Sequence, residues 1–174
     1  MLTPTKKLTL TAMFFALGVV LPFLTSQIKE IGDSLLPMHF VIMLCGAVCG
    51  PKYASICGGI LPVFRSICFG MPPIYPSAVW MALELATYGF VIGIMYINVF
   101  KRNIKFLIPS LVVSMISGRI VWGITKAILL NVGGKPFTFA MFIAGGFADA
   151  LPGIVIQLIL IPVIIKFLDK AVKK

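Results

Sequence analysis

Charged residues are scarce in this sequence of 174 residues: Asp, Glu, Lys and Arg together make up 11% of it. A soluble domain usually carries roughly 25%. Hydrophobic residues make up 60%, and the mean hydropathy is +1.09. A soluble fold of this length cannot bury so much apolar surface, whereas a lipid bilayer accepts it. The composition therefore excludes a soluble globular protein and predicts an integral membrane protein.

The common motifs of catalysis and nucleotide binding are also absent. The sequence has no GxxxxGK[ST] phosphate-binding loop, no HExxH zinc motif and no GxSxG nucleophile motif. Its single histidine, His39, is predicted at the rim of the membrane, far from Ser117-Gly118. We therefore expect that the chain is not an enzyme and that it binds no cofactor of its own. A small membrane enzyme that uses Glu84 or Asp149 as acid or base is kept as an alternative.

Nucleic-acid and metal binding are not expected either. The net charge is +10, but no long basic tract accompanies it, so loop charges of a membrane protein explain it better than a nucleic-acid partner. The four cysteines, Cys45, Cys49, Cys57 and Cys68, all lie inside apolar runs without the polar support that a metal site needs. They are interpreted as small packing residues.

Six hydrophobic segments fill nearly the whole chain. Because one membrane span needs about 20 apolar residues, they predict a single all-α membrane domain, residues 1–174, built as a six-helix bundle. The expected helices are approximately 8–24, 38–49, 53–69, 77–100, 106–130 and 138–168. Lys6 and Lys7 resemble the start of a signal peptide, but no cleavage site follows, so the first segment is interpreted as a helix that stays. Pro152 and Pro162 are expected to kink the last helix.

The basic loop residues predict the orientation. With the N-terminus inside, the inner side holds Lys6, Lys7, Lys52, Lys101, Arg102, Lys105, Lys166, Lys170, Lys173 and Lys174, and the outer side holds only Lys29 and Lys135. Cytoplasmic loops of membrane proteins carry such an excess of Lys and Arg. Both termini are therefore expected in the cytoplasm.

Polar residues inside the predicted spans gather on one side of the membrane. The charged ones are Arg65, Glu84, Arg119, Lys126 and Asp149, and His39 opens the second span. The predicted topology places all of them at mid-membrane or in its outer half. A charge inside a span normally faces a cavity or a partner, because lipid exposure costs about 2.5–3.5 kcal/mol on the insertion scale. The pattern predicts a polar pocket open to the outside, although these charges could also pair with each other.

Aromatic residues accompany these charges. Trp80, Glu84 and Tyr88 are spaced i, i+4, i+8 and form one stripe; Arg119, Trp122 and Lys126 form another; Tyr75 precedes the fourth span. Aromatic walls with a few polar groups suit a small polar organic ligand. The alternatives are interface aromatics for the two tryptophans, a loop aromatic for Tyr75 and a helix cap for His39. We expect His39, Arg65, Asp149 and the residues of both stripes, with Tyr75, to bind substrate.

The chain resembles the S components, the substrate-binding subunits of energy-coupling-factor (ECF) vitamin transporters. Three stretches carry the resemblance: TAMFFALG with its AxxxA pattern, LLPMHFVIMLCGAVCGPKY, and RSICFGMPPIYPSAVWMALELATYG. The last is similar to the branch that includes folate and pantothenate S components. No substrate motif of any one vitamin matches.

This resemblance implies a function and partners. The chain would capture a vitamin or related nutrient outside a bacterial cell membrane, topple in the bilayer and release it inside. A transmembrane T component would pack on Ala12 and Ala16, and two ATPase subunits would supply ATP hydrolysis. The loops at 25–37 and 70–76 would act as lids. A self-standing secondary carrier is the remaining alternative.

Overall fold

The computed structural model describes residues 3–25, 35–134 and 136–172, with side chains up to residue 168. Every regular element in these ranges is helical. The α-helices are α1 (Pro4–Thr25), α3 (Pro37–Cys49), α4 (Pro51–Phe69), α5 (Val79–Ile92), α6 (Leu107–Val132), α7 (Phe139–Ile143) and α8 (Leu151–Val172). Short π or 3-10 turns adjoin them at Ile74–Ala78, Gly93–Val99, Ile104–Phe106 and Ala144–Ala148. The predicted all-α class is confirmed.

Four helical stretches are long and apolar enough to cross a membrane, counting only the described residues: Pro4–Thr25, Ile74–Val99, Ile104–Val132 and Leu151–Leu168. Their length and composition support a multi-pass membrane protein. The helix α4 has 19 residues but carries Lys52 and Arg65, which lower its hydropathy. The apolar helix α3 is shorter, with 13 residues.

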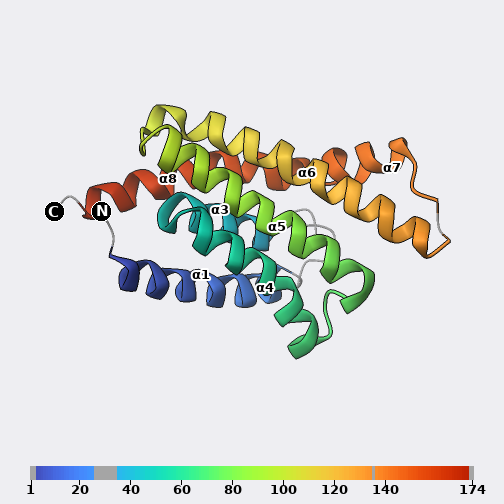
Figure 1. Cartoon of the computed structure of the whole chain (residues 1–174). Coiled ribbons are helices and arrows are strands. Elements are labelled where there is room, and N and C mark those ends of the chain that lie inside the picture. Colours follow the sequence, from blue (N-terminus) through green and yellow to red (C-terminus); the bar gives the residue numbers. More distant parts are fainter. Residues whose placement is uncertain (1–2, 26–34, 135, 173–174) are drawn as a thin grey trace.

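The short helix α3 is the centre of the bundle. Ten of its 13 residues are buried, and it packs against α1, α4, α5 and α8 (Figure 1). The sequence predicts a short second span that is tilted or begins in the preceding loop. In the structure α3 begins at Pro37, the last residue of that loop, and its apolar residues meet neighbouring helices on nearly every side.

Glycines let α4 and α5 approach one another closely. A Cβ atom added at Gly58 would lie 2.6 Å from the Leu85 carbonyl carbon, and one added at Gly89 would lie 2.7 Å from the Ala54 carbonyl oxygen. Real Cβ atoms do not come so near to backbone. Small residues serve this purpose at helix contacts in membranes, where packing rather than water drives association. The two helices therefore form a tightly packed pair, from which Arg65 of α4 and Glu84 of α5 project.

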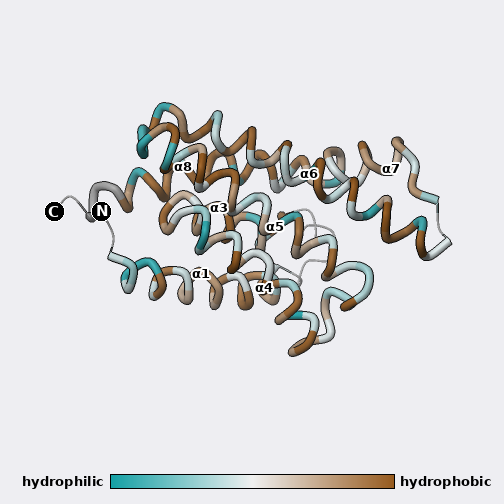
Figure 2. The backbone as a smooth tube through the Cα atoms, viewed as in Figure 1, coloured by the Kyte–Doolittle hydropathy of each residue, from teal (hydrophilic) through white to brown (hydrophobic). Residues whose placement is uncertain are grey.

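Both termini lie at the same end of the bundle (Figure 1). The connection between α5 and α6 lies at that end too, and hydrophilic residues mark it in Figure 2. The connections from α4 to α5 and from α6 to α7 lie at the opposite end. The chain ends therefore lie at one end of the bundle, and the connections that follow α4 and α6 lie at the other.

Helices occupy all six predicted segments, with two differences. The first helix begins at Pro4 rather than near residue 8; proline suits a first helical turn, and the Thr3 hydroxyl accepts a hydrogen bond from the Lys6 amide at 3.4 Å. The last segment, 138–168, is not one kinked helix. It is interrupted at Asp149 and Ala150, just before Pro152, and α8 then continues through Pro162.

Candidate functional site

A cavity of about 360 Å³ opens between α1, α3, α4, α5 and the loop that follows α4. Most of its lining is apolar. It includes three methionines (Met38, Met71 and Met81), two phenylalanines (Phe23 and Phe69) and the prolines Pro22, Pro37, Pro72 and Pro73. Thr25, Leu36, His39 and Arg65 complete the lining. The cavity therefore combines an apolar wall with two side chains that can carry charge.

The start of α3 places His39 at this cavity. Leu36 adopts a left-handed backbone conformation (φ 51°), and Pro37 then opens the helix. Proline at the first helical position costs no hydrogen bond, because that amide has no partner within the helix. His39 follows two residues later, still in the first turn of α3, and is buried. The Leu36-Pro37 pair that begins this helix therefore also determines where along the bundle His39 lies.

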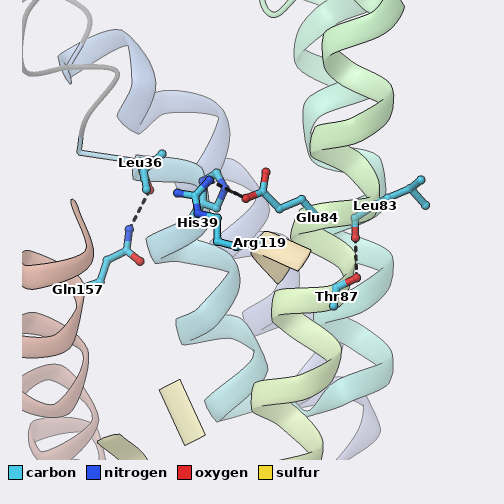
Figure 3. Close-up of polar contacts among 7 residues, drawn as sticks. All are labelled: Leu36, His39, Leu83, Glu84, Thr87, Arg119 and Gln157. Atoms are coloured by element: carbon cyan, nitrogen blue, oxygen red, sulfur yellow. Dashed lines mark hydrogen bonds and ion pairs between the residues drawn. The ribbon is translucent and has the colours of Figure 1, made fainter. Parts of the chain in front are cut away.

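Glu84 lies behind His39 and holds two basic side chains (Figure 3). Arg119 Nη1 lies 2.9 Å from Glu84 Oε1, and His39 Nε2 lies 3.2 Å from the same oxygen. The three residues come from α5, α6 and α3 and are all buried. A buried carboxylate is tolerated when a charged partner, here Arg119, compensates for its lost hydration. The structure therefore brings together three of the predicted site residues in one ionic cluster.

Tyr88 supports this cluster from the next turn of α5. Its ring packs edge-on against the His39 ring, with 5.2 Å between the centroids. A Cβ atom added at Gly118 would lie 2.7 Å from the Tyr88 ring, so α6 also closes on it. The Ser114 hydroxyl donates to the Tyr88 carbonyl at 2.9 Å. Tyr88 is thus fixed in the core beside the histidine and does not line the cavity.

Arg65 lines the cavity from α4 on the side facing α1. Its guanidinium donates a hydrogen bond to the Val19 carbonyl. The guanidinium carbon lies 4.8 Å from the centroid of Phe23 and 5.9 Å from that of Phe69. The side chain is buried, and its Nε atom has no hydrogen-bond partner within the part of the chain that the structure describes.

Lys126, Trp80 and Trp122 form a separate cluster between α5 and α6. The Lys126 ammonium lies 4.5 Å from the ring centroid of Trp122, 5.4 Å from that of Trp80 and 5.5 Å from that of Phe137. Arg119 connects the two clusters, with its guanidinium carbon 5.8 Å from the Trp122 ring. Lysine and both tryptophans are therefore brought together, but none of them lines the cavity described above.

The other predicted residues lie at the surface of the described chain. Tyr75 is 57% exposed and Asp149 is exposed; neither belongs to the cavity lining. Ala12 and Ala16 are both exposed on α1. Most of the predicted lid at 25–37 lies outside the described residues, whereas Met71, Pro72 and Pro73 of the second predicted lid line the cavity.

Two features of the site were not predicted from the sequence: Gln157 and the three methionines that line the cavity. The Gln157 amide is buried in α8 and donates to the Leu36 carbonyl at 3.3 Å, which ties α8 to the start of α3 (Figure 3). A lone amide inside an apolar segment is a signal that could have indicated it. Methionines carry no such signal, because they are equally common in cores and in lipid-facing positions.

Comparison with known protein families gives one match. The family model described as ECF transporter, substrate-specific component matches residues 6–165, nearly the whole chain. Searches of curated proteins and of solved structures give no match. The matched range contains most of α1, the cavity lining, the Glu84 cluster and most of α8. The chain therefore belongs to the family of substrate-specific components of ECF transporters.

Proposed function

We propose that this protein captures a vitamin or a related small nutrient in the cavity beside His39 and Arg65 and delivers it to an ECF importer. The observation that carries this proposal is the cavity itself, about 360 Å³ between α1, α3 and α4, in a chain whose family supplies the substrate-specific subunit. Ligand sites in proteins typically measure roughly 300–1,000 Å³ and combine apolar walls with a few polar groups. This cavity fits the lower end of that range.

The orientation of the bundle supports capture from outside a bacterial cell. Both termini lie at the end opposite the loop that follows α4 (Figure 1), and three residues of that loop line the cavity. The excess of Lys and Arg at the terminal end favours a cytoplasmic position for it. With six spans and cytoplasmic termini, the cavity opens on the exterior.

The exposed face of α1 suits a T component. Ala12 and Ala16 lie one turn apart and are exposed, and small residues at this spacing let a second helix approach closely. In this proposal, the T component binds there and two ATPase subunits drive release of the nutrient to the inside. Met71, Pro72 and Pro73 cover the cavity during capture.

Ligand capture by the isolated chain tests this function. The purified protein in detergent is incubated with yeast extract, which supplies the soluble vitamins, then washed and extracted for mass spectrometry. We expect one small molecule to be enriched on the folded chain. Proteoliposomes that contain this chain alone should not accumulate that molecule, and those that also contain the T component and both ATPases should accumulate it with ATP.

Two other results would replace the proposal. Accumulation by the chain alone would indicate a self-standing carrier. Conversion of the molecule into a product by the chain alone would indicate an enzyme.

A further inference from the structure

We infer that the captured molecule is a small monoanion whose carboxylate binds Arg65 and whose remaining body is apolar. This inference rests on the proposed function, because it concerns the ligand of the same cavity. It follows from the hydrogen bonds that Arg65 lacks, from the positions of the acidic side chains, and from the composition of the cavity wall.

Arg65 has more hydrogen-bond donors than its surroundings satisfy. A guanidinium carries five N–H groups. The described residues offer one acceptor, the Val19 carbonyl, and leave Nε without a partner although the side chain is 6% exposed. The rings of Phe23 and Phe69 lie near the guanidinium and hold it by cation–π attraction. Rings accept no strong hydrogen bond, so they orient the group and leave its donors for a ligand.

The positive charge of Arg65 has no carboxylate partner among the described side chains. Two acidic side chains are described. Glu84 is 1% exposed, does not line the cavity, and is engaged by Arg119 and His39. Asp149 is exposed in the connection before α8. Burying an unpaired charge costs several kcal/mol, and an anion in the cavity removes that cost.

The lining selects the kind of anion. Among the described residues of the lining, Arg65 alone has a permanent positive charge, so it balances a single negative charge. A phosphate dianion would leave one charge buried and uncompensated. A planar carboxylate also matches the two parallel donors of a guanidinium. Three methionines and two phenylalanines form much of the remaining wall, and methionine adapts its shape to an apolar ligand. A carboxylate on a compact apolar body satisfies both parts of the cavity.

Ligand recovery from Arg65 variants tests this inference. Wild-type protein, R65M, R65K and the control R102M are each incubated with yeast extract, washed and extracted, and the enriched molecule is identified by mass spectrometry. Arg102 is an exposed arginine at the opposite end of the bundle, where it donates to the Val48 carbonyl at 2.7 Å. The affinity for the identified molecule and the melting temperature without ligand are then measured for each variant.

We expect a carboxylate-bearing monoanion on the wild type and on R102M. R65M should bind it about tenfold to a hundredfold more weakly, because a hydrogen bond to a charged group is lost. R65K keeps the charge but loses the paired donors, so its affinity should lie between those of the wild type and R65M. If R65M does not fold, the R65K result decides, and affinity equal to that of the wild type contradicts the inference.

Other outcomes overturn the inference without affecting the proposed function. These are an enriched molecule that is neutral, cationic or anionic only through phosphate, and a carboxylate that R65M binds as tightly as the wild type. A lower melting temperature in R65M with unchanged affinity would mean that Arg65 pairs with a group of the protein instead. Failure of the proposed function looks different, because no molecule would then be enriched on the wild-type chain.

Discussion

Arg119 and His39 approach the same oxygen of Glu84 from two different helices, with Arg119 Nη1 at 2.9 Å and His39 Nε2 at 3.2 Å from Oε1. This shared oxygen joins α6 and α3 through α5, close beneath the cavity. Glu84 therefore has two roles in this structure. Its charge compensates that of the buried arginine, and it lies in close contact with the cavity-lining histidine.

Replacing Glu84 by glutamine should destabilise the ligand-free protein. Removing one partner of a buried ion pair leaves the other charge uncompensated and typically costs about 3–5 kcal/mol. The melting temperature without ligand should fall clearly in E84Q and in R119M. In the double variant E84Q/R119M the loss should be smaller than the sum of the two, because no lone charge remains. Additive losses would show that the contact contributes little to stability.

The glycine contact between α4 and α5 offers a matched pair of variants. Gly58→Ala should destabilise the bundle, because the added Cβ would lie 2.6 Å from the Leu85 carbonyl carbon. At the adjacent Gly59 the nearest atom, the Ala86 Cβ, is 4.0 Å away. Gly59→Ala should therefore be neutral or stabilising by up to about 1 kcal/mol, since alanine favours the helix. Equal melting temperatures for the two variants would contradict this close approach.

Lys126 should stabilise the hairpin of α5 and α6 rather than bind the ligand. Its ammonium lies within 5.5 Å of the rings of Trp80, Trp122 and Phe137, and each such contact is worth about 0.5–2 kcal/mol. Lys126→Met should lower the melting temperature, and Lys126→Arg should largely preserve it. Both should bind the nutrient with wild-type affinity. A large loss of affinity in a folded K126M protein would show that Lys126 belongs to the substrate site after all.

The exposed alanines of α1 should act in assembly and transport. Replacing Ala12 and Ala16 with leucine should abolish co-purification with the T component and ATP-driven uptake, because the bulkier face blocks close helix approach. Nutrient binding by the isolated variant should be unchanged. Ala140→Leu, at an exposed alanine on α7, serves as the control and should assemble normally. Loss of binding with intact assembly would contradict the role of this face.

The sequence predicted the all-α class and a multi-pass membrane protein, because length and hydropathy determine which stretches can cross a bilayer. It could not predict which charges pair. Arg65 and Arg119 look alike in the sequence, each a lone arginine in an apolar segment. Their helices present them to different neighbours: Arg119 meets Glu84, and Arg65 meets two phenylalanine rings and the cavity. Such differences depend on helix rotation and packing, which arise only in the folded bundle.

The stripe on α5 shows the same limit. Spacing correctly indicated that Trp80, Glu84 and Tyr88 share a side of the helix. The side chains nevertheless do not share one set of partners. Trp80 lies near Lys126, whereas Glu84 and Tyr88 both contact His39, and Glu84 also pairs with Arg119. A shared helix face therefore did not amount to one shared cavity wall.

The most direct test of ligand capture in this cavity is titration of the recovered nutrient against two tryptophan variants of α5. Met81 lines the cavity, whereas Leu83, two residues further along, is half exposed and lies outside the lining. In M81W the added indole fills the cavity, so we expect the folded variant to bind the nutrient at least about tenfold more weakly than the wild type. L83W should bind it with wild-type affinity. Wild-type affinity in a folded M81W protein would contradict capture in this cavity, because the ligand would then bind elsewhere.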